Sequence, residues 1–123
     1  MRLIRLVLIC LMLPAAALAQ SFDEIAKLLP EGSYAERADR VAMLAASGDA
    51  RAEALLTALA DGDLAVLKSD GRLVVVAKGA ARDALTGADA GQVTRRDLTQ
   101  VRVNNNLRGQ IRAALGALAL VAA

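Results

Sequence analysis

The stretch from Val101 to Leu118, V-R-V-N-N-N-L-R-G-Q-I-R-A-A-L-G-A-L, restricts the possible folds more than any other part of the chain. It joins a strand-like run to the longest amphipathic pattern in the sequence. In residues 101–103 two valines alternate with an arginine, which predicts a short half-buried strand. The next three residues are asparagines that can cap a helix, and we expect Asn105 or Asn106 to be the cap of a helix beginning near Leu107.

The helix predicted from Leu107 needs a core to cover. Its apolar residues recur at spacings of three and four and therefore share one face: Leu107, Ile111, Ala114, Leu115 and Leu118. Arg108 and Arg112 flank this stripe, so we expect both to face water. After Arg112 the sequence has no charged residue and continues in alanine, leucine and valine. This apolar end favours either contact with a neighbour or self-association through the C-terminal helix.

Two capping signatures predict short helices earlier in the chain. Ser21 is followed three residues later by Glu24, and the helix that they begin should stop by Pro30. Ser33 and Glu36 repeat the arrangement for a second helix that closes at Ser47-Gly48. We expect its buried face to be Tyr34, Ala38, Val41, Met43, Leu44 and Ala45.

A third helix is predicted directly after the second. We expect Asp49 to cap it and Asp61-Gly62 to end it. Its apolar residues again recur at three and four: Ala52, Leu55, Leu56 and Leu59. Two helices joined by Ser-Gly-Asp are typical of a single HEAT-like pair. Such a pair cannot bury both of its faces alone, so residues beyond Gly62 must cover it.

A small antiparallel sheet is predicted between these helices and the C-terminal one. Residues 64–67 and 73–76 are rich in valine and leucine, and Asp70-Gly71 between them is a strong hairpin signal. Residues 79–91 have little periodicity, so we expect a loop there. Residues 101–103 would add the third strand. Together these elements predict an α+β domain.

The first residues have the pattern of a secretory signal. A basic start and an apolar run lead to Ala17-Leu18-Ala19, so we expect a signal peptide over residues 1–19 and a mature domain over residues 20–123 that is exported and periplasmic. The only cysteine, Cys10, lies in this segment. Residues 20–123 hold 13 basic and 13 acidic side chains, and this balance argues against a nucleic-acid partner.

The residues that catalysis usually requires are scarce in this sequence. Histidine is absent and the expected mature chain has no cysteine, so we expect no enzyme, no catalytic residues, no metal and no cofactor. Asp61 and Asp63 around Gly62 are interpreted as ordinary turn residues, and Arg95-Arg96 as a solvated turn. Residues 87–91 lack the lysine of a phosphate-binding loop.

Several motifs, in order, resemble a known family. D-G-R-L at Asp70 to Leu73, D-A-L-T-G at Asp83 to Gly87 and V-R-V-N-N-N-L-R at Val101 to Arg108 stand between a signal-like segment and an Ala/Leu-rich helix. Over residues 1–118 the chain resembles the amino-terminal extracytoplasmic region of the urea ABC transporter permease subunit, UrtB type. The sequence ends at Ala123, before the permease of that family would begin.

The resemblance implies a non-catalytic part of transmembrane urea transport. Its implied partners are the permease and the other subunits of the ABC transporter, with membrane association only through a downstream permease; attached to it, the chain would stand at the bacterial inner membrane. The alternative is a freestanding periplasmic interaction protein without transport activity. A carboxylate-based hydrolase ranks last, because no acidic pair has a recognisable acid–base spacing.

Overall fold

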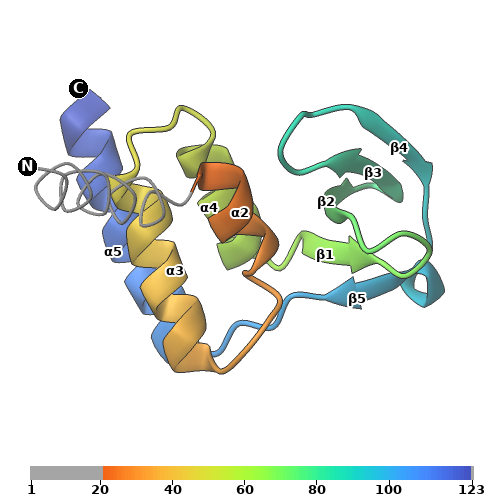
Figure 1. Ribbon diagram of the computed structural model, residues 1–123, viewed down its shortest axis with the longest axis horizontal. Coiled ribbons are helices and arrows are strands. Elements are labelled where there is room, and N and C mark those ends of the chain that lie inside the picture. Colours follow the sequence, from red (N-terminus) through yellow and green to blue (C-terminus); the bar gives the residue numbers. More distant parts are fainter. Residues whose placement is uncertain (1–20, 123) are drawn as a thin grey trace, which may run out of the picture.

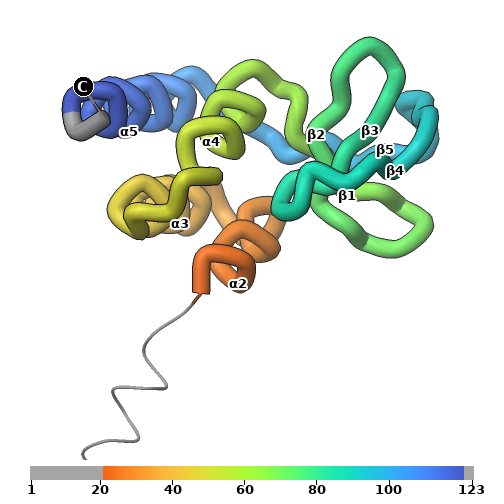
Figure 2. The backbone as a smooth tube through the Cα atoms, turned by 90° about the horizontal axis from the view of Figure 1, so that it is seen from above, coloured from red at the N-terminus to blue at the C-terminus, as the bar shows by residue number. Residues whose placement is uncertain are grey.

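The computed structural model describes residues 21–122, which form four α-helices and a five-stranded antiparallel sheet. The helices lie on one side of the molecule and the sheet on the other (Figure 1), which confirms the α+β class. Figure 2 shows the same division from above. The predicted signal peptide over residues 1–19 lies outside the described residues. The elements are α2 (Phe22–Lys27), α3 (Tyr34–Ala46), α4 (Ala52–Asp61), β1 (Leu64–Leu67), β2 (Leu73–Ala77), β3 (Ala80–Asp83), β4 (Asp89–Gln92), the 3₁₀ turn η1 (Arg95–Asp97), β5 (Leu98–Gln100) and α5 (Asn105–Ala122).

Both predicted capping signatures are confirmed at the first two described helices. The Ser21 hydroxyl accepts a hydrogen bond from the Glu24 amide, which satisfies one of the amide groups exposed at the start of α2. At α3 the exchange is reciprocal, because Ser33 Oγ accepts from the Glu36 amide while the Glu36 carboxylate accepts from the Ser33 amide. These bonds to Ser33 lower the pKa of Glu36.

The buried face of α3 differs from the predicted one. Val41 and Leu44 are buried as expected, but Tyr34 and Met43 are exposed to 41% and 45%. In their place Arg37 is buried, with 6% of its surface exposed. The apolar pattern therefore misplaced the face, because a polar side chain lies at its centre.

The start of α4 also differs from the prediction. Arg51, rather than Asp49, holds the cap position, and no side chain caps this helix. Asp49 instead stabilises the turn before the helix, where its Oδ1 accepts a hydrogen bond from the Arg51 amide at 2.9 Å. The predicted apolar face of α4 is confirmed, since Ala52, Leu55, Leu56 and Leu59 are all buried.

The hairpin of β1 and β2 is confirmed. Leu64 pairs with Val75 and Val66 with Leu73, and Gly71 in the connecting turn has a positive φ of 74°. The side chains alternate between two apolar clusters, so both faces of these strands are covered. Leu64 and Leu73 join the helical core, whereas Ala65 and Val74 form a smaller cluster with Leu67 and Ala81 on the opposite face.

The loop predicted over residues 79–91 is wrong, because this segment holds β3 and β4. Ala77 pairs directly with Ala80, so Lys78 and Gly79 form a two-residue turn with φ of 53° and 77°. Positive φ at both positions matches the twist of a two-residue hairpin. The sheet order is β4-β3-β2-β1-β5, with a register shift between Ala81 and Arg82 where β4 pairs with β3.

The strand predicted at residues 101–103 is wrong, because the strand lies directly before them. β5 covers Leu98–Gln100 and pairs with β1, whereas residues 101–103 carry no strand assignment. The Val101 amide still donates to the Leu64 carbonyl at 3.0 Å, and the Val101 side chain turns into the helical core. Residues 101–103 therefore serve as the crossover from the sheet to α5.

The cap of α5 is the first asparagine, not the second or third. Asn104 Oδ1 accepts from the Leu107 amide at 2.8 Å. The predicted apolar stripe is confirmed: Leu107 and Ile111 are buried, and Ala114, Leu115 and Leu118 pack against the same core. Through this stripe α5 contacts both α3 and α4, so it is the element that completes the helical layer.

Candidate interaction surface

The outer face of α5 is apolar and uncharged over its second half. Ala113, Gly116 and Ala117 are exposed there, and Leu120 has 80% of its surface exposed. On the opposite face of the same turns, Leu115 and Leu118 pack against the core. This half of α5 therefore presents apolar atoms both inward and outward, an arrangement more typical of a helix between two neighbours than of one that meets only water.

A polar hollow of about 210 Å³ lies at the other end of α5. It is bounded by the first residue of α3, the crossover 101–103 and the first turns of α5, with Tyr34, Arg102 and Arg108 among its lining residues. Figure 1 shows the starts of α3 and α5 at the same end of the helical layer. Gln100 closes one side, where its Nε2 donates to the Gly62 carbonyl at 2.7 Å.

The prediction that Arg108 faces water is wrong. It is partly buried, and its Nε donates to the Ala60 carbonyl at 3.1 Å. Its Nη1 donates to Asn105 Oδ1 at 3.3 Å. The guanidinium is therefore held between the end of α4 and the start of α5, whereas Arg112, one turn further along, is exposed as predicted.

The buried Arg37 joins two segments that are far apart in the sequence. Its Nη1 donates to the Arg102 carbonyl at 3.1 Å, and its Nη2 donates to the Pro30 carbonyl at 3.1 Å. Its Nε donates to the Leu29 carbonyl. These bonds fix the crossover 101–103 against the α2–α3 connection. Sequence reasoning missed this role, for which the only signal is weak: an arginine placed among the apolar positions of α3.

A second arginine, Arg51, joins three segments at the surface. It forms ion pairs of 2.8 Å with Asp23 and Asp49, and its guanidinium carbon lies 4.6 Å from the centre of the Phe22 ring. Its Nη1 donates to the Leu85 carbonyl at 3.2 Å. Hydrogen bonds from the Arg51 side chain and amide lower the pKa of Asp49 to about 2.

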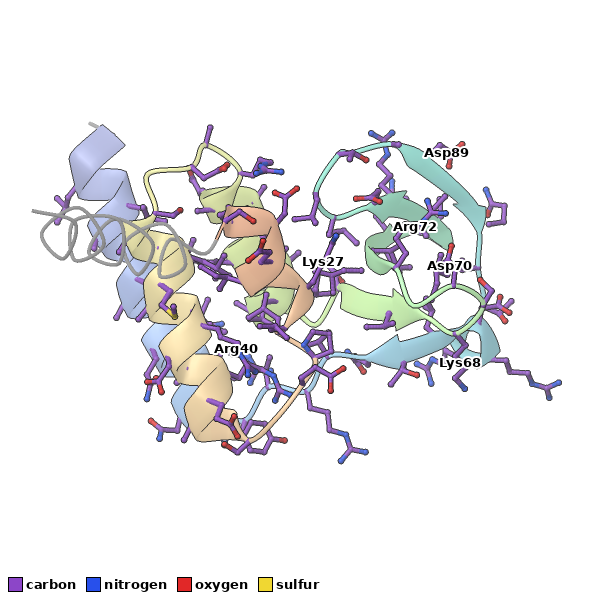
Figure 3. The ribbon with its side chains drawn as sticks, in the orientation of Figure 1. Lys27, Arg40, Lys68, Asp70, Arg72 and Asp89 are labelled. Atoms are coloured by element: carbon purple, nitrogen blue, oxygen red, sulfur yellow. The ribbon has the colours of Figure 1, made fainter. Side chains whose placement is uncertain are left out.

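Charged side chains also gather around the β1–β2 turn, where Figure 3 labels Asp70 and Arg72, with Lys27 of α2 to one side of them. Arg72 pairs with Asp70 at 2.9 Å and lies 4.0 Å from Asp83, and Lys27 lines a hollow with all three. The hydrogen bonds from the Arg72 amide and side chain lower the pKa of Asp70. Burial acts to raise the pKa of Asp83, but amide hydrogen bonds from the adjoining loop and the charge of Arg72 lower it overall. These charges compensate one another, so the cluster serves the fold.

The acidic and basic pairs considered from the sequence do not converge on a chemical site. Asp61 and Asp63 lie on either side of Gly62 and are both exposed. Within residues 21–122 no cluster of acidic side chains is suited to hold a metal ion. Arg95 and Arg96 lie in the exposed η1 turn. There the Asp97 carboxylate accepts a hydrogen bond from the Thr94 amide and pairs with neither arginine in the described part of the chain.

None of the helices within residues 21–122 combines the length and apolar character that a bilayer crossing needs. Comparison with models of known protein families, with curated proteins and with solved structures finds no match to this chain.

Proposed function

We propose that this chain is a non-catalytic interaction module that stands outside the membrane as the amino-terminal part of a urea ABC transporter permease subunit. The proposal combines the resemblance of its motifs with one structural observation, the exposed apolar outer face of α5. Its partners would be the permease and the other transporter subunits. Its place would be the periplasm, at the inner membrane when the permease is attached.

The outer face of α5 supports an interaction role on physical grounds. Ala113, Gly116 and Ala117 have small side chains, so another helix could approach the backbone of α5 closely along them. Exposed Leu120 would lose its contact with water on docking, which is favourable by roughly 25 cal/mol for each Å² of apolar surface buried. We include in the proposal that α3 and α4 are a HEAT-like pair, extended by α5, onto which further helices could stack.

The motifs behind the resemblance have structural roles in this chain. Asp83 Oδ1 accepts from the Leu85 and Thr86 amides at 2.9 and 3.1 Å, which shapes the D-A-L-T-G loop. In V-R-V-N-N-N-L-R, Val101 enters the core and Asn104 caps α5. These residues therefore have roles in the fold of this chain. The proposal that urea is the transported substrate rests on the order of the motifs alone.

Urea uptake by a bacterium that carries this gene tests the proposal. An in-frame chromosomal deletion of codons 20–122 should abolish uptake of radiolabelled urea at low concentration, while uptake of an amino acid through another ABC transporter stays normal. Reintroducing the wild-type gene should restore urea uptake. Normal urea uptake in the deletion strain would contradict the transport role.

The second candidate is a freestanding periplasmic interaction protein, which the same apolar face of α5 would also suit. Unchanged urea uptake together with a defect in another envelope process would favour it. Self-association of the isolated chain through α5 is expected under the transporter proposal, because the face would lack its neighbour, and sedimentation of the purified chain at several concentrations measures it. A strictly monomeric chain would favour the freestanding protein. A mass that rises with concentration, and that falls to a monomer in Leu120→Glu, would identify α5 as the contact.

A further inference from the structure

The described residues that line the polar hollow at the start of α5 include two arginines and no acidic side chain. Arg102 and Arg108 line it, yet neither forms an ion pair among the described residues, unlike Arg40, Arg51 and Arg72. We propose that this hollow binds a carboxylate side chain from an acidic segment of a partner protein, with Arg112 extending the contact along α5. The inference rests on the proposed interaction role and adds the chemistry of the partner.

Of the two arginines, Arg108 has its guanidinium held by hydrogen bonds, whereas Arg102 is placed through its backbone. The Arg102 carbonyl is fixed by Arg37 Nη1, and its side chain is exposed. Arg108 is fixed through Nε and Nη1, and within the described residues its Nη2 donates no hydrogen bond. A guanidinium that is already oriented loses less side-chain freedom on binding a carboxylate than a mobile one would.

The charge of the lining residues favours an anion, although exposed Asp61 and Asp63 flank the lining residue Gly62. After Asp97 the sequence contains Arg102, Arg108 and Arg112 but no acidic residue. A further cation contacts two of the lining residues, because buried Arg37 donates to the Arg102 carbonyl and its guanidinium carbon is 5.5 Å from the centre of the Tyr34 ring. The hydrogen-bond partners of Arg37 are all uncharged carbonyls. Those carbonyls orient the charge without cancelling it.

The shape of the hollow favours a side chain of a larger partner over a free ion. Its volume of about 210 Å³ suits one carboxylate group and the carbons that carry it. An exposed ion pair contributes only about 0.2–1 kcal/mol, so a single free anion would be held weakly. Arg108 and Arg112 lie one helical turn apart, and an acidic segment could therefore engage both and gain from their linked binding.

Fluorescence anisotropy with a labelled hexaglutamate peptide and the purified full chain tests this inference. We expect saturable binding at low salt that Arg102→Gln weakens about fivefold and Arg102→Glu abolishes, because the charge at the hollow supplies the attraction. Arg82→Gln is the matched control: Arg82 is also an exposed arginine, but it lies on β3, and its loss should leave binding unchanged. A hexalysine peptide should not bind. Circular dichroism of each variant verifies folding.

Several results would overturn the inference. These are no binding of hexaglutamate, equal weakening by Arg82→Gln and Arg102→Gln, and full competition by millimolar inorganic phosphate, which would identify a site for free oxyanions. Binding to phosphatidylglycerol vesicles that depends on Arg102 in the absence of peptide binding would identify a membrane contact instead. None of these results bears on urea uptake, which the deletion strain measures, so failure here is distinguishable from failure of the transport role.

Discussion

Two arginines join distant segments of this molecule, one inside it and one at its surface. Arg37 is buried and its hydrogen bonds all go to backbone carbonyls, from the α2–α3 connection and from Arg102, while its guanidinium carbon lies 5.5 Å from the centre of the Tyr34 ring. Arg51 is partly exposed and contacts two carboxylates, an aromatic ring and one carbonyl. Both place a loop against a helix, but they rely on different physical interactions.

The two junctions should respond differently to solvent. A buried cation costs desolvation energy that the fixed carbonyl dipoles around Arg37 must offset, and these dipoles neither titrate nor bind salt. The ion pairs of Arg51 are reached by water and salt and include a titratable partner, Asp49. We therefore expect the Arg37 junction to determine how stable the helical layer is. The Arg51 junction should determine how that stability changes with pH and salt.

The largest effect is expected from Arg37→Met. This change leaves the carbonyls of Leu29, Pro30 and Arg102 without their donor, so unfolding in urea should show a loss on the order of 3 kcal/mol or more. Arg82→Met, at an exposed arginine of β3, is the control and should change little. Equal stability of the Arg37→Met protein and the wild type would show that the carbonyl bonds contribute nothing net.

A smaller loss is expected from Gly71→Val in the β1–β2 turn. Gly71 has a φ of 74° with open space around it, so the cost is one of backbone strain and should be about 1 kcal/mol or more. Because this position touches neither junction, the loss should be the same at low and high salt. Thermal unfolding at both salt concentrations measures it, and an unchanged melting curve would contradict the strain.

Arg51→Met should destabilise the protein less than Arg37→Met, and its effect should depend on salt. Screening weakens the pairs with Asp23 and Asp49 in the wild type, so the difference in urea midpoint between wild type and variant should shrink when NaCl is raised from about 0.05 M to about 1 M. The corresponding difference for Arg37→Met should persist. Similar salt dependence in the two variants would remove the distinction between the junctions.

The smallest effect is expected from acid acting on Asp49. Its pKa in the folded chain is about 2, below its ordinary value of 3.8, so its contribution to stability is complete above about pH 4 and is lost as the pH falls towards 2. Asp49→Asn lacks this contribution at every pH. The stability difference between wild type and Asp49→Asn should therefore narrow between pH 4 and 2, and a difference that stays constant over this range would contradict the lowered pKa.

Periodicity and capping residues predicted the elements that rely on local sequence. Ser33 with Glu36, the faces of α4 and α5, and the Asp70-Gly71 turn all depend on interactions within a few residues, and each is confirmed. The Lys78-Gly79 turn was missed because lysine at positive φ has no strong local signal. β3 and β4 were missed with it, since β3 depends on its pairing with β2 and β4 on its pairing with β3.

The candidate surface was predictable only in part. The apolar outer end of α5 is evident in the sequence, because no charged residue comes after Arg112. The hollow is not evident in the sequence, because Tyr34, Arg102 and Arg108 come together only in the folded chain. The crossover that places Arg102 there is held by the hydrogen bond from the Val101 amide to the Leu64 carbonyl. Burial of Arg37 was equally hidden, because its partners are backbone carbonyls that carry no residue-type signature.

Photo-cross-linking in the living bacterium tests directly whether α5 contacts the urea transporter. A photoreactive phenylalanine analogue at Ala113, on the exposed outer face of α5, should capture a subunit of the transporter, while the same analogue at exposed Arg82 on β3 should not. The captured protein is identified by mass spectrometry. Capture of transporter subunits from Ala113 alone is the predicted result. Capture only of a second copy of this chain, or of a protein unrelated to transport, would contradict the proposed role of α5.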